Sequence, residues 1–345
     1  MSLLWLQLII RGVIPIRIAV DGFGGDFAPE QVVAGCLQAA SLDRIPILLT
    51  GDQAVLRPLI EGKPGSELIE IVHASQQIGM DEAPIEAVRS KVDSSLNVAA
   101  NLVREGRADA LVSAGNTGAC MAASLFRIGR IKGIERPAIT SLMPTVKGVC
   151  LMVDVGANVD CRPSQLAQFA RMGTVYAERV LAIANPKVGL LNIGEEPTKG
   201  NDAAQKAYEL LSNSEINFIG NVEGRDIAQG EADVVVCDGF VGNIVLKFAE
   251  GLATALFSML KAEMTQNLPR KLAAAVLKPG LANIKKKMDY TEYGGAPLLG
   301  VKGVVIIAHG SSNHKAIRNA IRVAKEAVDN QVVQKITEIM VGEAD

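Results

Sequence analysis

The chain has 345 residues, of which 49% are hydrophobic and 4% aromatic, and it contains 33 glycines. A long, aliphatic, glycine-rich chain is typical of a compact α/β protein and excludes an intrinsically disordered one. The 35 basic and 37 acidic residues leave a formal charge of −2. Such a balance argues against a nucleic-acid-binding protein.

Five cysteines occur singly, mostly within apolar runs, and form no Cys-x-x-Cys motif: Cys36, Cys120, Cys150, Cys161 and Cys237. This pattern predicts reduced, buried thiols in a cytoplasmic protein and no structural zinc site. The apolar start of the chain has neither a basic region nor a cleavage site, and Arg11 ends it too early to span a bilayer. We expect residues 1–15 to be an extension, with an interfacial anchor as the alternative.

Short aliphatic runs alternate with helical patterns along the chain. Runs of this length are typical of strands buried in a parallel sheet, and they occur at residues 16–20, 45–49, 68–72, 110–112, 149–153, 188–193, 216–219, 232–237 and 303–308. Helical patterns follow most of them. The alternation predicts an α/β fold with a doubly wound, mostly parallel sheet in an α/β/α sandwich.

The strand predicted at residues 188–193 ends in a loop rich in charge. Glu195, Glu196 and Lys199 lie among Gly, Pro and Thr residues, and Asn201 or Asp202 can cap the helix that follows. Ligands of open α/β sheets bind at the carboxyl ends of strands, so this loop is a candidate site. A solvated turn with weak ion pairs is the alternative for this loop taken alone.

Five further predicted strand ends carry small or polar loops: residues 21–26, 113–118, 154–160, 238–243 and 309–313. Each one alone fits an ordinary capped turn. Together with the loop at 192–201 they would lie at one edge of a doubly wound sheet, and we expect them to form one anion-binding cleft. Lys199 is the only cation in the six loops, which makes it the first candidate for binding an anion there.

Cofactor motifs are not found. In the glycine-rich loop after residue 20, the third glycine of a dinucleotide fingerprint would fall at Phe27. Asp154 and Asp160 could hold a metal, but without a third spaced carboxylate we favour a capping or orienting role. We therefore expect neither a metal nor an organic cofactor.

A long apolar helix and a lysine-flanked segment come before the last strand. Residues 244–264 carry apolar side chains at helical spacing, which predicts core or a subunit interface. In residues 269–288 we expect Pro279 and Gly280 to break the helix. The segment could contact lipid headgroups or an acidic protein, or cover the partner subunit, and its candidate contacts are Lys271, Val276, Leu277, Lys278, Lys285, Lys286 and Lys287.

The loop motifs resemble the bacterial phosphate acyltransferase (PlsX) family. The motifs are DGFGGDFAPE from Asp21, SAGNTGACMAA from Ser113, DVGANVDCRP from Asp154, LLNIGEEPTKGN from Leu190, CDGFVGNIVLK from Cys237 and AHGSSN from Ala308. The resemblance runs from about Ile16 to the terminal helix, with Phe23 where the family usually has Met. It implies a phosphotransacetylase- and isopropylmalate-dehydrogenase-like fold.

The resemblance also implies a function. The enzyme would transfer a fatty acyl group from acyl-[acyl carrier protein] to inorganic phosphate, giving acyl phosphate for phospholipid synthesis. It would be a cytoplasmic homodimer associated with the inner face of the cell membrane, supplying a glycerol-3-phosphate acyltransferase. We expect residues 16–345 to form one catalytic unit, with 244–290 as a helical segment for dimerisation and membrane contact.

Residue chemistry assigns candidate roles within this reaction. Lys199, His309 and Asp238 are the catalytic candidates, with Asp238 better suited to orienting than to proton transfer. The candidates for binding phosphate or substrate are Gly25, Asp26, Asn116, Thr117, Gly118, Asp154, Asn158, Asn192, Glu195, Asn243, Ser311 and Ser312. Because carboxylates repel an anion, we expect Glu195 and Glu196 to orient Lys199 or a neighbouring backbone.

Three alternative functions remain open. A phosphotransacetylase-type enzyme would use acyl-CoA with the same phosphate chemistry, and a metal-dependent 3-hydroxy-acid dehydrogenase could share the fold. A membrane-bound scaffold for lipid-synthesis enzymes would need no catalysis. Comparing the rates on acyl-CoA and on acyl-[acyl carrier protein] separates the first alternative from the function that the family resemblance implies.

Overall fold

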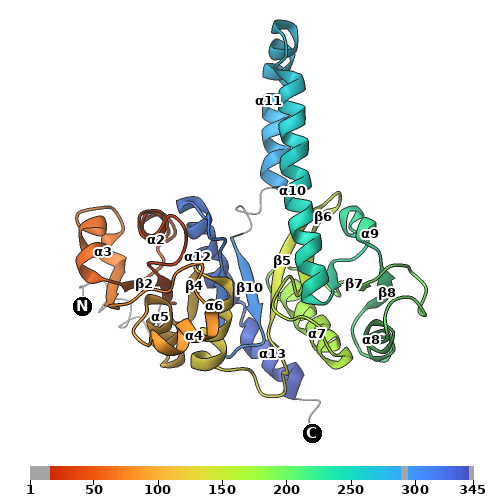
Figure 1. Ribbon diagram of the computed structural model, residues 1–345, viewed down its shortest axis with the longest axis horizontal. Coiled ribbons are helices and arrows are strands. Elements are labelled where there is room, and N and C mark those ends of the chain that lie inside the picture. Colours follow the sequence, from red (N-terminus) through yellow and green to blue (C-terminus); the bar gives the residue numbers. More distant parts are fainter. Residues whose placement is uncertain (1–15, 289–293, 342–345) are drawn as a thin grey trace. The chain divides into compact units, whose positions relative to one another are not determined.

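The computed structural model describes residues 16–288 and 294–341, which fold into two compact units (Figure 1). The first unit comprises the described residues up to Ile139, the segment Glu178–Ala182 and the described residues after 293. The second unit comprises Thr140–Ala177 and the described residues from Ile183 onward to 288. Residues 1–15, predicted to be an extension, lie outside the described part. One catalytic unit over residues 16–345 stays a prediction.

The first unit has a mostly parallel sheet. Its strands are, in spatial order, β3 (Ile69–His73), β2 (Ile47–Gly51), β1 (Ile18–Asp21), β4 (Ala110–Ser113), β11 (Val304–Ile307) and β10 (Ala296–Leu299). Only β10 runs antiparallel, pairing with β11 and with the first two residues of β5 (Ala138–Thr145). Most side chains of β1, β2, β4 and β11 are buried, as expected for continuous aliphatic strands between two helical layers.

Helices cover both faces of this sheet (Figure 1). On one face, α2 (Glu30–Asp43) and α12 (His314–Asp329) pack together, and on the other α5 (Ser95–Arg104) packs against β1, β2 and β4. Ser94 and Asn313 cap α5 and α12 by accepting hydrogen bonds from N–H groups of the first turn. The remaining helices are α3 (Gln53–Ile60), η1 (Ser66–Leu68), α4 (Pro84–Ser90), α6 (Thr117–Ala123), the π-helical η2 (Ser124–Ile128) and α13 (Val332–Val341).

The second unit also consists of a mostly parallel sheet with helices. Its strands are, in order, β5 from Thr140 on, β6 (Gly148–Val153), β9 (Val234–Val236), β7 (Val188–Leu191) and β8 (Phe218–Val222), and only the β5–β6 pair is antiparallel. Its sheet helices are α7 (Pro163–Arg179), α8 (Asp202–Ser212) and α9 (Gly224–Gln229). Gly173 lets α7 approach the sheet, because a Cβ there would lie 2.7 Å from a Val153 methyl.

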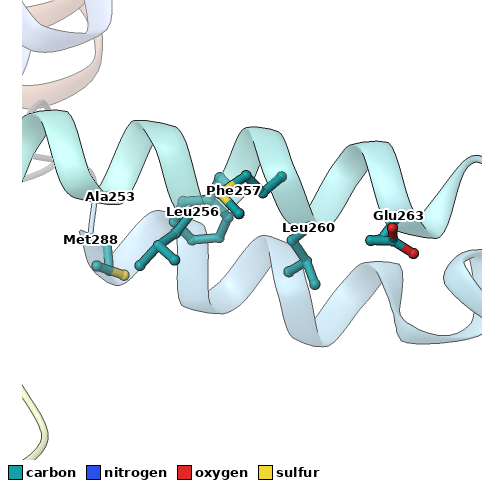
Figure 2. Close-up of a pocket in the computed structure, with 7 residues that line it drawn as sticks. Ala253, Leu256, Phe257, Leu260, Glu263 and Met288 are labelled. Carbon is teal, nitrogen blue, oxygen red and sulfur yellow. The ribbon is translucent and has the colours of Figure 1, made fainter.

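A helical hairpin projects from the second unit (Figure 1). It consists of α10 (Gly239–Met264), whose 26 residues span roughly 39 Å, and α11 (Leu268–Met288), which packs alongside it. Among the described residues, α10 alone is long and apolar enough to cross a membrane, although few of its side chains are buried. Figure 2 shows an apolar groove of about 400 Å³ on this hairpin, lined by Ala253, Leu256, Phe257, Met259, Leu260, Glu263 and Met288.

The predicted break at Pro279 and Gly280 is wrong, because α11 continues through both residues. Proline removes one N–H group, which would have bonded the carbonyl of Ala275. That stretch of helix is exposed, so water can satisfy the freed carbonyl. The side chains of Lys285, Lys286 and Lys287 lie outside the described residues.

The predicted fold class is confirmed, and the structure adds elements that the sequence did not indicate. Strands β5 and β10 escape prediction because both contain proline, at Pro144 and Pro297, and both are antiparallel neighbours in a mostly parallel sheet. The short helices α4 and α9 and the last helix, α13, were not predicted either. The helix after β4 changes from α to π geometry after Ala123.

Candidate active site

Three of the predicted loops meet in the first unit, where they follow the neighbouring parallel strands β1, β4 and β11. The backbone N–H of Asp26 donates to the carbonyl of Gly310 at 2.8 Å, which joins the loops after β1 and β11. A Cβ at Gly24 would lie 2.8 Å from the backbone nitrogen of Gly115, so glycine is required for the loops after β1 and β4 to approach each other. We call these three loops the first loop cluster.

Asp21 holds the base of the first loop cluster. Its buried carboxylate accepts a hydrogen bond from the Ser113 hydroxyl at 2.8 Å, and Ser113 Oγ in turn accepts from the backbone N–H of Gly115 at 3.1 Å. Burial raises the pKa of Asp21, against hydrogen bonds from Ser95 and Ser113 that lower it. Sequence reasoning placed Asp21 in a candidate loop without assigning it a role, and its position at the end of a buried strand was the available signal.

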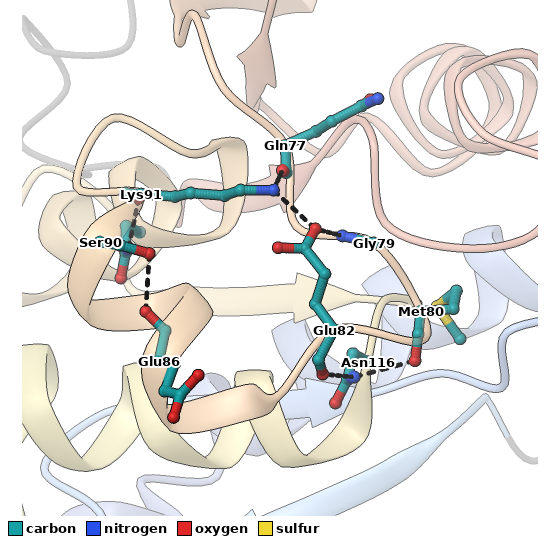
Figure 3. Close-up of polar contacts among 9 residues, drawn as sticks. Gln77, Gly79, Met80, Glu82, Glu86, Ser90, Lys91 and Asn116 are labelled. Carbon is teal, nitrogen blue, oxygen red and sulfur yellow. Dashed lines mark hydrogen bonds and ion pairs between the residues drawn. The ribbon is translucent and has the colours of Figure 1, made fainter.

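Asn116 joins the first loop cluster to a loop that sequence reasoning did not include, Gln77–Ala83 (Figure 3). Its Oδ1 caps α6 by accepting the N–H of Ala119 at 3.0 Å. Its Nδ2 donates to the carbonyls of Met80 at 2.9 Å and Glu82 at 3.2 Å. Both polar groups of the predicted phosphate ligand Asn116 are therefore engaged within the protein, whereas the neighbouring Thr117 is exposed.

His309 and Ser311 contact each other at the end of β11. The backbone N–H of Ser311 donates to His309 Nδ1 at 3.2 Å, and the Ser311 hydroxyl lies 2.8 Å from the same nitrogen. Because a backbone N–H can only donate, Nδ1 is the acceptor and the proton of the neutral ring lies on Nε2. Ser312, predicted to bind phosphate, is buried, and Asn313 caps α12.

In the second unit, the other predicted loops follow the neighbouring parallel strands β6, β9 and β7. We call them the second loop cluster. Asp154 organises the first of them, because its carboxylate accepts hydrogen bonds from the backbone N–H groups of Gly156, Ala157 and Asn158 and from the Asn158 side chain, at 2.7–3.2 Å. Burial raises the pKa of Asp154 to about 6, against these hydrogen bonds, which lower it.

Asp238 joins the loops after β6 and β9. One carboxylate oxygen accepts the N–H of Cys161 at 2.8 Å, and the other caps α10 by accepting the N–H of Phe240 at 2.8 Å. Asn243, one turn into α10, lies beside the loop of Asp154, since a Cβ at Gly156 would lie 3.6 Å from its side chain. With both oxygens engaged by backbone donors, Asp238 is placed to hold these loops together.

Lys199 lies in a loop that is closed by hydrogen bonds to its backbone. Asn192 Nδ2 donates to the carbonyl of Lys199 at 3.0 Å, and the N–H of Lys199 donates to the carbonyl of Glu196 at 3.0 Å. The Lys199 side chain is exposed, and no carboxylate of the described residues lies within 4 Å of its ammonium group. Glu195 lies instead 3.6 Å from Arg225, a cation after β8 that sequence reasoning missed.

The structure thus brings the six predicted loops together in two groups of three, each at the carboxyl ends of neighbouring parallel strands. That the two loop clusters form one cleft stays a prediction. In the described residues, no group of three His, Cys, Asp or Glu side chains is arranged to hold a metal. All five cysteines are buried and free, and burial raises the pKa of Cys161 to about 12.

Known proteins resemble this chain over nearly its full length. The family model described as "Fatty acid synthesis protein" matches residues 16–335. A protein of Desulfitobacterium hafniense named phosphate acyltransferase is 56% identical over 322 residues, which is 93% of this chain and 96% of the relative. The protein of the same name from Heliobacterium modesticaldum is 53% identical over 332 residues, 96% of this chain and 99% of the relative.

Solved structures share the fold at low sequence identity. A phosphotransacetylase from Streptococcus pyogenes superposes with a TM-score of 0.64 at 18% identity, covering 95% of this chain and 99% of that protein. A 4-hydroxythreonine-4-phosphate dehydrogenase from Klebsiella pneumoniae superposes with a TM-score of 0.54 at 12% identity, covering 91% and 99%. These likenesses confirm the predicted fold class. Because the family model spans most of the chain and the relatives exceed half identity, the chain belongs to the phosphate acyltransferase (PlsX) family of enzymes, as its motifs predict.

Proposed function

We propose that this protein transfers a fatty acyl group from acyl-[acyl carrier protein] to inorganic phosphate, giving acyl phosphate for phospholipid synthesis. The observation that carries the proposal is the family membership, because the relatives are named phosphate acyltransferase and the family model is described as a fatty acid synthesis protein. The ammonium group of Lys199 is exposed at a strand end and has no carboxylate of the described residues within 4 Å, which supports an anionic substrate.

The chemistry needs placement and charge neutralisation more than a protein nucleophile. A phosphate oxygen attacks the thioester carbonyl carbon, a C–O bond forms, and the C–S bond then breaks to release the carrier-protein thiolate. Phosphate is already an anion near neutral pH, so no serine or cysteine has to be acylated. Burial raises the pKa of all five cysteine thiols, which agrees with a mechanism that uses no thiolate of the protein.

In this proposal Lys199 offsets the charge of phosphate or of the developing oxyanion. His309 donates its Nε2 proton to the oxyanion or to the departing thiolate, because its Nδ1 already accepts from Ser311. Asp238, Asp154 and Asn116 act as positioning residues, since their polar groups bind loop backbone. Holding the phosphate oxygen next to the thioester carbonyl carbon in the correct orientation also increases the reaction rate strongly.

The hairpin is the proposed surface for the larger partners. The apolar side chains of α10 and α11 are exposed, among them Phe248, Leu256 and Val276. A monomeric soluble protein rarely leaves so much apolar surface in water, so we assign α10 to a homodimer interface and α11 to contact with the inner face of the cell membrane. Membrane association would place a cytoplasmic enzyme next to a glycerol-3-phosphate acyltransferase that consumes its product.

The test uses purified protein, radiolabelled phosphate and either acyl-[acyl carrier protein] or acyl-CoA carrying the same chain. We expect labelled acyl phosphate to form with a clear preference for the carrier-protein donor and in step with thiol release. A preference for acyl-CoA would point to a phosphotransacetylase-type enzyme. Absence of label with both donors, in protein shown to be folded, would overturn the proposed function.

A further inference from the structure

The loop Gln77–Ala83 is fastened at both ends although it belongs to none of the six predicted loops (Figure 3). Lys91, just after α4, donates to the carbonyl of Gln77 at 2.9 Å and to the carboxylate of Glu82 at 2.6 Å. The same Glu82 oxygen accepts the backbone N–H of Gly79 at 2.6 Å. Together with the two bonds from Asn116, these contacts hold the backbone on each side of Met80.

The loop carries the side chain of Met80 into the first loop cluster. A Cβ at Gly310 would lie 2.7 Å from the terminal methyl of Met80 and 3.3 Å from both carboxylate oxygens of Asp26. The thioether side chain therefore lies against the bare backbone of Gly310, between the loops after β1 and β11. It is nevertheless 42% exposed, so a large apolar group faces solvent at the first loop cluster.

We propose that Met80 contacts the fatty acyl group of the substrate and that Glu82 and Lys91 are positioning residues which fix Met80 for that contact. The proposal rests on the proposed acyl transfer and extends it to a residue outside the predicted loops. An exposed apolar side chain whose backbone is fixed by polar contacts is typical of a binding site. A bound ligand can cover the apolar surface, which is otherwise exposed to water. Methionine also adapts to apolar chains of different shape.

The charges around Met80 favour the acyl group over phosphate as its ligand. The carboxylates of Asp26, Asp81 and Glu82 lie in or beside the loop, and they would repel an anion. Lys91, the cation that binds the loop, is already paired with Glu82. A neutral hydrocarbon chain meets no such repulsion, and it gains from covering the Met80 side chain.

The first experiment varies Met80 and measures the KM for acyl donors of short, medium and long chain. Met80→Ala is expected to raise the KM for long-chain donors about five- to tenfold, with kcat and the KM for phosphate little changed. Met80→Leu, which keeps the apolar volume, should stay near wild type. Leu42→Ala, at a 64% exposed position on α2, is the matched control. An unchanged KM for every donor in Met80→Ala, or a raised KM for phosphate alone, would overturn the proposal.

The second experiment tests whether Lys91 and Glu82 act through Met80. Lys91→Met is expected to raise the KM for long-chain donors about threefold, and Lys91→Arg should restore it because the ion pair is kept. In a Met80→Ala background the same Lys91→Met change should have no further effect, since the two residues share one role. Equal, additive effects in both backgrounds would show that the ion pair does not act through Met80.

A binding measurement separates this inference from the proposed function. A carrier protein bearing a non-transferable acyl thioether is titrated into wild type and Met80→Ala, and its Kd is measured without any turnover. We expect a Kd about fivefold weaker in the variant for a long chain and equal Kd values for a very short one. Equal Kd values at every length would overturn the inference even if wild type forms acyl phosphate, whereas a chain-dependent loss would support it even if no acyl phosphate forms.

Discussion

The carboxylate of Glu195 lies 3.6 Å from the guanidinium of Arg225, which begins α9 after the neighbouring strand β8. Both side chains are largely exposed, so the pair contributes little stability. The pair matters because it determines which cation the Glu195 carboxylate neutralises. Glu195 had been expected to orient Lys199 or a neighbouring backbone, but it lies next to Arg225. With Glu195 paired to Arg225, the ammonium group of Lys199 has no carboxylate of the described residues within 4 Å and can offset a substrate anion.

Replacing Lys199 should remove most of the activity without unfolding the protein. We expect Lys199→Ala to lower kcat/KM for acyl-phosphate formation by about 10²- to 10³-fold, because a preorganised charge next to the reacting oxygens is lost. Lys206→Ala is the matched control, since Lys206 is also an exposed lysine and pairs with Asp202 on its own helix, α8. Near-normal turnover of Lys199→Ala at saturating phosphate would remove Lys199 from the mechanism.

The stability of the second unit should depend on pH through Asp154. Its pKa in the folded protein is about 6, above the ordinary 3.8, so the folded state binds this proton more tightly than the unfolded state. The stabilisation of the folded state by the protonated Asp154 carboxyl is fully present below pH 3.8 and is lost as pH rises through 6. Between pH 5 and pH 7, wild type should lose about 1 kcal/mol more than Asp154→Asn, whose side chain does not titrate. Parallel urea-unfolding curves for the two proteins across this range would contradict the assignment.

Polar substitutions midway along α11 should weaken membrane binding without affecting turnover. Val276 and Leu277 are 80% and 57% exposed on α11, between Lys271 and Lys278. Replacing both with serine should lower sedimentation with anionic liposomes several-fold, because apolar contact and charge attraction act together at a bilayer surface. Turnover on soluble acyl-[acyl carrier protein] should be unchanged. Val146→Ser, at an exposed site on the turn between β5 and β6, serves as the control, and equal sedimentation of all three proteins would refute the prediction.

A charge within the groove of the hairpin should disrupt the dimer. Leu256 and Leu260 line the groove and are 54% and 42% exposed, as expected for side chains that a second subunit covers (Figure 2). Leu256→Glu should shift the mass measured by light scattering toward that of a monomer, because an unpaired carboxylate in an apolar interface is strongly unfavourable. Lys261→Glu, on the same helix, is the charge control. A wild-type monomer at micromolar concentration would overturn the dimer proposal.

Local patterns in the sequence were enough to predict the main elements and most of their caps. Asn201, one of the two predicted caps of its helix, caps α8, and Ser94 and Asn116 cap their helices by the same side-chain chemistry. Such features depend on residues a few positions apart, so the chain carries them directly. The strands with proline were missed because their pairing depends on partners far away along the chain.

The sequence by itself determined the α/β class, the family and the loops that end the parallel strands, because aliphatic periodicity and short motifs are local. Only the tertiary structure decided which of those polar groups are available to a substrate. Asn116 and Asp238 are occupied by backbone from segments distant in the chain, and Glu195 is paired with Arg225. The placement of Met80 against Gly310 likewise depends on residues more than two hundred positions apart meeting at one edge of a sheet, which no local pattern encodes.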